Sequence, residues 1–214
     1  MKIAVICYCS FNYIDQAEVA IKSFKKQYPN AEYDIDVLTK TKDYGLPKCN
    51  HGKLDWCVNR FKVFTDFKDY DRVIMIDSDL VAVGNIDYLF SEELNKYDAC
   101  AVPDYGAKHY YPDTTKQYKY IVNAGVLILN KSILDEGFLT VLPLLTSYNG
   151  TEQGYYTDYF HKYNINWKRL PVKYNYCLDN YYPQEDDKRV IHFTGNQPFN
   201  EEWHRIKEEI TNEH

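Results

Sequence analysis

The sequence predicts an α/β domain with a mostly parallel central sheet flanked by helices. Residues 73–76 form a short, β-branched and unbroken apolar run, which is typical of a strand covered on both faces. Strand-like and helix-like segments alternate before this run, and that order indicates parallel strands joined by right-handed crossovers. The chain has 214 residues, of which 45% are hydrophobic and 26% charged, which is typical of one globular domain with ample core.

The first half of the chain supplies three of the expected strands. Residues 3–9 form an apolar run, and a helix is expected from about residue 15 to residue 28 because its apolar positions share one stripe. Residues 35–39 predict a second strand, and the lysine-rich stretch 40–52 predicts a loop. A second amphipathic helix then leads into the strand at 73–76. Its apolar positions are Leu54, Cys57, Val58, Phe61, Phe64 and Phe67.

The second half mixes strands with shorter helices. The expected strands cover residues 99–103, 122–130 and 190–193. The expected helices cover residues 87–90, 133–148, 152–163 and the stretch from residue 201 onward. Residues 107–120 are polar and rich in tyrosine, which predicts a loop. Ser132 can cap the helix at 133–148, and Pro143 is expected to kink or shorten it.

The strand at 73–76 ends at two aspartates, Asp77 and Asp79. Neither carboxylate suits a strand interior, and charged groups are rarely buried without a partner. Open α/β sheets bind ligands beyond the carboxyl ends of their strands, so the simplest interpretation is a divalent cation held by both carboxylates. The alternative is an ordinary turn, since aspartate favours turns. The apolar run before the aspartates favours the cation.

Charge and hydropathy argue against two classes of partner. The net charge of -6 argues against nucleic acid, which requires a basic excess. No apolar run reaches the roughly 18 residues that a membrane span needs. The apolar start of the chain is too short for a signal peptide and predicts a strand instead.

The six cysteines predict free thiols in a reducing compartment, the cytoplasm. They form no C-x-x-C pair and no dense framework of the kind seen in disulfide-rich domains. Cys49, His51 and Cys57 resemble part of a zinc site, but a fourth ligand at finger spacing is missing.

Four blocks stand in order along the chain. Their central residues are Asp77-Ser78-Asp79, Asn123-Ala124-Gly125, Glu152-Gln153-Gly154 and His192-Phe193-Thr194-Gly195. In order and spacing they resemble the D-x-D, asparagine-small-glycine, acidic-Gln-Gly and His-Phe-x-Gly blocks of glycogenin-like enzymes in glycosyltransferase family 8. The resemblance covers about residues 1–199, and the joint occurrence of the blocks is highly specific. In its small size the chain is also similar to a glycosyltransferase domain encoded by a chlorella virus.

The resemblance implies a single GT-A domain over residues 1–214, cut from a longer chain or complete, with a Rossmann-like sheet. It further implies a metal-dependent, retaining glycosyltransferase that moves a hexose from a nucleotide sugar, most simply a UDP-sugar, to a sugar or glycan acceptor. The implied cofactor is Mn²⁺ or Mg²⁺, which stabilises the charge of the leaving diphosphate. Aspartate oxygens suit either ion, and an imidazole ligand favours Mn²⁺.

Individual residues take their expected roles from the same resemblance. The expected metal ligands are Asp77, Asp79 and His192, although a lone histidine in a strand is more often a core residue. The expected catalytic residues are Asp77, Asp79, Glu152 and Gln153. The expected donor-binding residues are Cys7, Cys9, Ser10, Tyr13, Ser78, Asn123, Gly125 and Gly195, with Asn175 as a weaker candidate. For Tyr13, packing at the start of a helix is an equal alternative.

Two departures from the family pattern bear on function. The lysine that usually follows the last block and contacts the diphosphate is absent, because the chain reads Asn196-Gln197 there. The basic residue before the D-x-D strand is either Arg60 or Lys62. A non-catalytic nucleotide-sugar or glycan binder is therefore the main alternative. A D-x-D phosphatase of the haloacid dehalogenase type is weaker, because such enzymes need a later Gly-Asp motif that the chain lacks.

Overall fold

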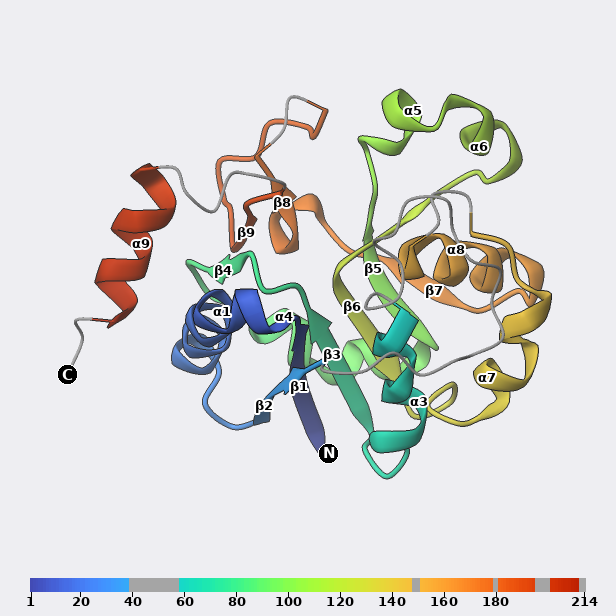
Figure 1. Ribbon diagram of the computed structural model, residues 1–214, viewed down its shortest axis with the longest axis horizontal. Helices are drawn as coiled ribbons and strands as arrows, with labels where there is room; N and C mark the ends of the chain where they lie inside the picture. The colour runs from blue at the N-terminus through green and yellow to red at the C-terminus, as the bar shows by residue number, and fades with distance from the viewer. Residues whose placement is uncertain (39–57, 148–150, 179–180, 195–200, 212–214) are drawn as a thin grey trace.

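A six-stranded sheet forms the centre of the computed structural model, which describes residues 1–38, 58–147, 151–178, 181–194 and 201–211 (Figure 1). Across the sheet the strands are β2 (Glu32–Val37), β1 (Ile3–Cys9), β3 (Arg72–Ile76), β6 (Val122–Asn130), β5 (Ala99–Pro103) and β7 (Trp167–Arg169). Strand β6 is antiparallel to both of its neighbours, whereas the other neighbouring pairs are parallel. The expected mostly parallel α/β sheet is therefore confirmed, with one reversed strand near its middle.

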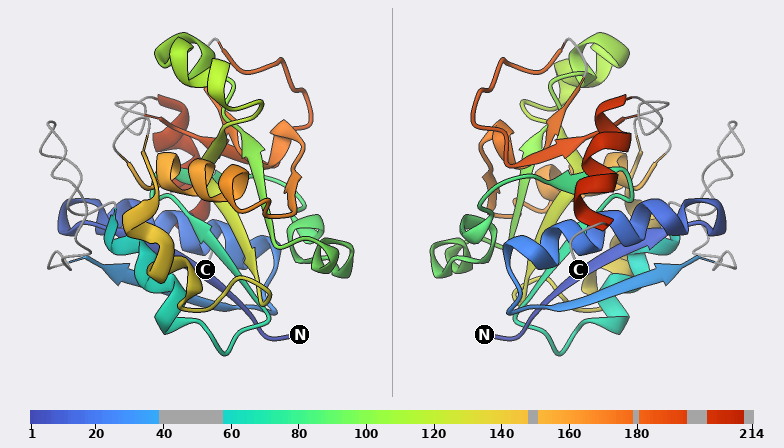
Figure 2. Two further views of the ribbon diagram at one scale, coloured as in Figure 1. Left: turned by 90° about the vertical axis from the view of Figure 1, so that its right-hand side faces the viewer. Right: turned by 90° about the vertical axis from the view of Figure 1, so that its left-hand side faces the viewer.

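The central strands are buried on both faces because their side chains alternate between two apolar clusters. Ile74 and Ile76 pack on one side with helix α1 (Ile14–Gln27), and Val73 and Met75 pack on the other. The second side is covered by the 3₁₀ helix η2 (Val58–Lys62) and by α3 (Val63–Asp66), α7 (Gly137–Val141) and α8 (Glu152–Lys162). Figure 2 shows α8 in front in its left view and α1 in front in its right view.

A second, three-stranded sheet lies beyond the carboxyl end of β3. Its strands are β4 (Leu80–Ala82), β9 (Val190–His192) and β8 (Tyr176–Cys177), with β9 in the middle. Helix α9 (Glu201–Thr211) packs through Trp203 and Ile206 against Val81 and Ile191 of this sheet. The register pairs Leu80 with His192, so the start of β4 and the end of β9 lie together.

Short helices fill most of the remaining described chain. They are η1 (Phe11–Tyr13), α4 (Asp87–Phe90), η3 (Glu92–Lys96), α5 (Ala107–Tyr110), α6 (Pro112–Gln117), η4 (Leu142–Leu144) and η5 (Val172–Tyr174). No helix among the described residues is both long enough and apolar enough to cross a bilayer.

Two expectations for these segments are wrong. The stretch 107–120 contains α5 and α6 instead of a loop, because Asp104 accepts a hydrogen bond from the amide of Ala107 and Pro112 starts a helix without losing a bond. The helix expected at 133–148 is reduced to α7 and η4. Ser132 does not cap a helix, because its hydroxyl donates to Asp98 at 2.6 Å.

Arg72, the first residue of β3, is a fully buried cation that joins this strand to the chain around α4 and η3. Its guanidinium donates to Asn130 Oδ1 at 2.8 Å and to Asn95 Oδ1 at 2.7 Å. It also donates to the carbonyl oxygens of Leu89 and Ser91, at 3.0 and 3.1 Å. Burying a cation is tolerated here because each of its donor groups meets an acceptor.

We expect Arg72→Ala to lower the free energy of unfolding by at least about 3 kcal/mol, because several buried acceptors lose their donor together. Urea unfolding followed by circular dichroism measures this loss. Arg205→Ala is the matched control, since Arg205 is exposed on α9 and forms a surface pair with Glu209; it should change stability by less than about 0.5 kcal/mol. Equal effects of the two substitutions would contradict the structural role of Arg72.

Candidate metal and sugar-donor site

The two aspartates after β3 lie where the large sheet meets the small one. The amide of Asp77 donates to the carbonyl of Gly125 at 3.0 Å, which continues the β3–β6 pairing. The amide of Phe193 donates to the carbonyl of Asp79 at 2.9 Å, which continues the β4–β9 pairing. The backbone on both sides of Ser78 is thus fixed by strand pairing, and both carboxylates are held near the end of β9.

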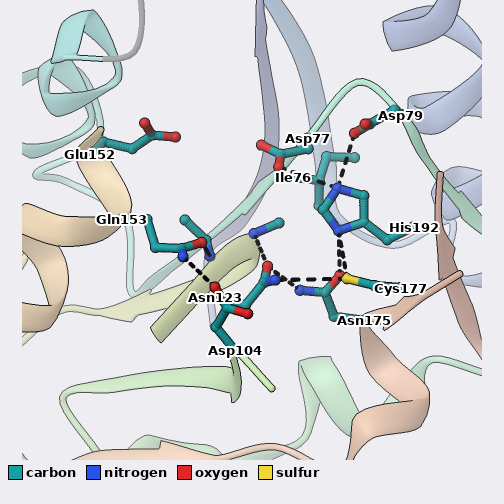
Figure 3. A network of polar contacts seen from close by, with 12 residues as sticks. Ile76, Asp77, Asp79, Asp104, Asn123, Glu152, Gln153, Asn175, Cys177 and His192 are labelled. Atoms are coloured by element: carbon teal, nitrogen blue, oxygen red, sulfur yellow. Dashed lines mark hydrogen bonds and ion pairs between the residues drawn. The ribbon is translucent and has the colours of Figure 1, made fainter. Parts of the chain in front are cut away.

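Asp77, Asp79 and His192 form a cluster whose candidate ligand atoms lie within 4.8 Å of one another (Figure 3). The Nε2 atom of His192 lies 3.2 Å from Asp79 Oδ1 and 3.6 Å from Asp77 Oδ2. The imidazole is buried, whereas the two carboxylates are about a quarter exposed, at 27% and 21%. The cluster therefore has a closed protein side and a side open to a ligand.

A chain of amides fixes which nitrogen of His192 faces the aspartates. Asn123 donates to the hydroxyl of Tyr182 at 2.7 Å, and its own oxygen accepts from Asn175 at 2.7 Å. The oxygen of Asn175 then lies 2.9 Å from His192 Nδ1. An amide oxygen only accepts, so Nδ1 carries a proton and the lone pair of the neutral imidazole is on Nε2. That lone pair points to the two carboxylates, as a metal ligand requires.

Gly125 is required by the close approach of the His192 ring. A β-carbon at this position of β6 would lie 2.6 Å from both Cε1 and Nδ1 of His192, well inside van der Waals contact. The family resemblance assigned Gly125 to donor binding, and the group that lies closest against it in the structure is the imidazole of His192.

The basic residue at the site is Arg60, not Lys62. Arg60 is buried, and its guanidinium donates to Asp77 Oδ1 and to Glu152 Oε1. Lys62 instead pairs with Asp36 at 2.5 Å and with Asp66 at 3.6 Å, outside the site.

The formal charges of the site suit a divalent cation. Asp77 and Glu152 pair with the guanidinium of Arg60, and Asp79 lies against His192, so these three carboxylates and this one cation leave two negative charges when His192 is neutral. Buried charges need compensation, and hard oxygen ligands with one imidazole fit Mn²⁺ or Mg²⁺. The donor set thus fits the cofactor that the sequence implied.

The residues expected around the sugar lie beside this cluster. Glu152 begins α8 and is buried against Arg60. Gln153 accepts a hydrogen bond from the amide of Ala124 at 3.1 Å and donates to Asp104 Oδ2 at 2.7 Å. Glu152 and Gln153 therefore meet the strand that carries Asn123 and Gly125.

Sequence reasoning missed two residues of this region, Asp104 and Tyr182. Asp104 follows the apolar strand β5 directly, which is the same signal that identified Asp77 after β3. Tyr182 contacts Asn123 across 59 residues of chain, and no local pattern predicts such a contact.

The residues expected around the nucleotide lie at the carboxyl end of β1. Cys7 and Cys9 are buried in the core, where burial raises the pKa of both thiols, and both are free. Ser10 is half-buried at the start of η1, and Tyr13 is 45% exposed before α1. Gly195 and the stretch 196–199 lie outside the described residues, as do Cys49, His51 and Cys57. The donor-binding roles of these residues stay predictions.

Known proteins similar to this chain are glycosyltransferases. A putative UDP-glucuronate:xylan alpha-glucuronosyltransferase 5 of Arabidopsis thaliana is 31% identical over 124 residues, which cover 56% of this chain and 18% of that protein. Glycosyltransferase GlyA of Streptococcus pneumoniae is 25% identical over 153 residues, which cover 61% of this chain and 21% of that protein. The chain spans about a fifth of the length of these two relatives. No family model matches the chain.

The fold is that of a solved glycosyltransferase. The crystal structure of the galactosyltransferase LgtC in complex with donor and acceptor sugar analogs matches with a TM-score of 0.67 at 16% identity. The match covers 97% of this chain and 95% of LgtC. The GT-A fold and the resemblance to glycosyltransferases that the sequence implied are thereby confirmed.

We expect Mn²⁺ affinity to fall about tenfold per pH unit as the pH drops from 7.5 to 6. Burial lowers the pKa of His192, but the charges and hydrogen bonds of Asp79 and Cys177 together raise it more, so in the metal-free protein the pKa lies well above its usual value. Below that raised pKa the imidazole holds a proton that Mn²⁺ must displace. Calorimetric titration at three pH values measures the slope.

The variant His192→Ala should bind Mn²⁺ more weakly and lose this slope. His204→Ala is the matched control, since His204 is exposed on α9, and it should keep both the affinity and the slope. If His192→Ala kept the wild-type affinity and slope, while its metal-free melting temperature fell, His192 would be a core residue and not a ligand.

Proposed function

We propose that this chain is the donor-binding and catalytic GT-A domain of a metal-dependent, retaining glycosyltransferase. It moves a hexose from a nucleotide sugar, most simply a UDP-sugar, to a sugar or glycan acceptor. The observation that carries the proposal is the cluster of Asp77, Asp79 and His192 at the junction of the two sheets, in a chain with the fold of a glycosyltransferase. Residues 1–214 act as one such domain in this proposal, in a reducing compartment that keeps its buried thiols free.

Asp77, Asp79 and His192 hold the divalent cation in this proposal. The cation supplies charge stabilisation for the diphosphate as its bond to the sugar breaks. Arg60 holds Asp77 and Glu152 in place, so the carboxylates keep one geometry before the donor arrives. The sequence lacks the lysine that usually contacts the diphosphate, so donor binding depends more strongly on this fixed arrangement.

Glu152 and Asn123 bind hydroxyl groups of the donor sugar in this proposal. A buried carboxylate needs hydrogen-bond donors, and a polyol supplies them where Arg60 leaves acceptor positions open. On the nucleotide side, Tyr13 stacks on the base. The rest of the nucleotide pocket is lined by Cys7, Cys9, Ser10 and Ser78. Gly195, which lies outside the described residues, is likewise assigned to donor binding.

Gln153 positions groups and does not attack the sugar. Its amide oxygen accepts from Ala124 and its nitrogen donates to Asp104, and an amide is a poor nucleophile in any case. We therefore favour front-face attack. The acceptor oxygen forms the new bond to the anomeric carbon, the bond to the diphosphate breaks on the same face, and the diphosphate takes the acceptor's proton.

We expect Asp79→Asn to reduce Mn²⁺-dependent hydrolysis of a UDP-sugar by at least about a hundredfold. Loss of one charged ligand removes several kcal/mol of stabilisation from the leaving diphosphate. The fold should persist, because the side chain lies in a connection and is 21% exposed. Hydrolysis is measured over a panel of UDP- and GDP-sugars, with Asp113→Asn on the exposed helix α6 as the control.

Wild-type turnover by Asp79→Asn with an unchanged Mn²⁺ dependence would falsify the metal assignment. Donor binding without any hydrolysis in the wild type would favour the alternative function, a non-catalytic nucleotide-sugar binder.

We expect Glu152→Gln to lower hydrolysis at least tenfold while UDP affinity changes less than about threefold. A hydrogen bond to a charged group contributes roughly 1.5–3 kcal/mol, and Glu152 lies on the sugar side of the site. Gln153→Ala should act in the same direction. Titration with UDP alone separates the two effects, and Glu18→Gln on the exposed face of α1 is the control. If Glu152→Gln lowered the affinity for UDP as much as it lowers hydrolysis, Glu152 would not belong to the sugar subsite.

A further inference from the structure

A cavity of about 150 Å³ lies beside α5 and is lined in part by Asp104. Its walls come from the end of β5, from α5, from the segment 118–121 and from the end of β7. Figure 1 shows α5 and α6 standing beyond the ends of β5 and β6. Apart from Asp104, which holds Gln153, the residues that line the cavity have no part in the proposed function.

Ordered side chains form the walls of this cavity. Tyr118 is buried, and its hydroxyl donates to Asp158 at 2.8 Å. The guanidinium of Arg169 lies 4.0 Å from the centre of the Tyr120 ring, so its positive charge is held against the wall that Tyr120 forms. The amide of Asp104 donates to the carbonyl of Ile121 at 2.8 Å, which fixes the strand end against the segment 118–121.

The cavity is positively charged in a chain whose net charge is -6. Lys108, Lys119 and Arg169 line it, and no acidic residue in the described part of the chain forms an ion pair with any of the three. The one carboxylate in its lining, Asp104, already accepts bonds from Gln153 and from the amide of Ala107. Three cations around one small cavity attract an anion and can donate charge-assisted hydrogen bonds to it.

Two contacts join the cavity to the candidate site. Asp104 lines the cavity and accepts the side-chain amide of Gln153. Tyr105 also lines it, and its ring lies 5.3 Å from that of Tyr182, whose hydroxyl accepts from Asn123. A group held in the cavity is therefore one side chain away from the residues assigned to the donor sugar.

We propose that this cavity is an acceptor subsite for an anionic group, a carboxylate or a phosphate carried by the acceptor glycan. The proposal rests on the glycosyltransferase function proposed above. Pockets that enclose whole small ligands measure about 300–1,000 Å³, so this cavity takes one sugar unit or its charged substituent and not an oligosaccharide. The tyrosine rings provide the apolar faces on which a sugar ring stacks.

The test is binding of four probes to the full chain, without donor or metal: methyl glucuronide, glucose 6-phosphate, methyl glucoside and inorganic phosphate. Amide NMR shifts of Tyr105 and Ile121, which both line the cavity, report occupancy. We expect at least one of the two anionic sugars to bind tenfold more tightly than methyl glucoside and to weaken as salt is added. Preference for the glucuronide or for the sugar phosphate identifies the source of the anion. Equal binding of neutral and anionic sugars overturns the proposal, and so does inorganic phosphate binding as tightly as the sugar phosphate.

Variants then assign the effect to the cavity. Lys108→Gln combined with Arg169→Gln should reduce the tenfold preference to less than twofold. Lys22→Gln combined with Lys25→Gln removes the same charge from the exposed face of α1 and should leave the preference intact. A preference that survives in the cavity variant overturns the proposal.

Donor hydrolysis separates this proposal from the function on which it rests. The cavity variant should hydrolyse UDP-sugar at the wild-type rate, because neither substituted residue touches the metal or the donor sugar. A wild type that binds anionic sugars selectively but hydrolyses no donor refutes the catalytic function and leaves an anionic-sugar binder. A wild type that hydrolyses donor but shows no anion preference refutes the acceptor subsite alone.

Discussion

The site depends on one electrostatic constraint, the pairing of a single buried guanidinium with two carboxylates from distant parts of the chain. Arg60 comes from the segment before β3, Asp77 from its end and Glu152 from the start of α8. A buried ion pair contributes little net stability, but removing one partner leaves an uncompensated charge. The three elements are therefore held in one arrangement, and the remaining negative charge lies beside His192, where a divalent cation fits.

A second constraint is geometric and comes from uncharged groups. Asn175 and Asn123 fix the orientation of the His192 ring, and the absence of a side chain at Gly125 gives that ring its space. These contacts lie behind the ligand atoms, yet they decide which nitrogen is presented to the aspartates. Positioning of the His192 ring is thus shared among residues that are not themselves candidate metal ligands.

The sequence best predicted the strands that are formed by unbroken apolar runs. Strands β1, β5 and β6 match the expected bounds, because an unbroken apolar run needs no knowledge of the neighbours to be read as buried. Strands β7 and β8 were not expected, because they have three and two residues and exist only through pairing with β5 and β9. The helix expected at 133–148 is shorter for a similar reason, since the hydroxyl of Ser132 binds Asp98 instead of capping the helix.

Among the site residues, position directly after a strand indicated Asp77 and Asp79. The choice between Arg60 and Lys62 required knowledge of tertiary contacts.

The placement of the three candidate ligands has a mechanical consequence. Asp77 directly follows β3 of the large sheet, Asp79 directly precedes β4 of the small sheet, and His192 ends β9 of the small sheet. A cation bound by all three residues links the two sheets, and its binding free energy also opposes their separation. Such a cation would lengthen the lifetime of the closed state for β9 and the helix packed on it, and their amide hydrogens would exchange with solvent more slowly. A cation held in this way would be a part of the tertiary structure as well as of the chemistry.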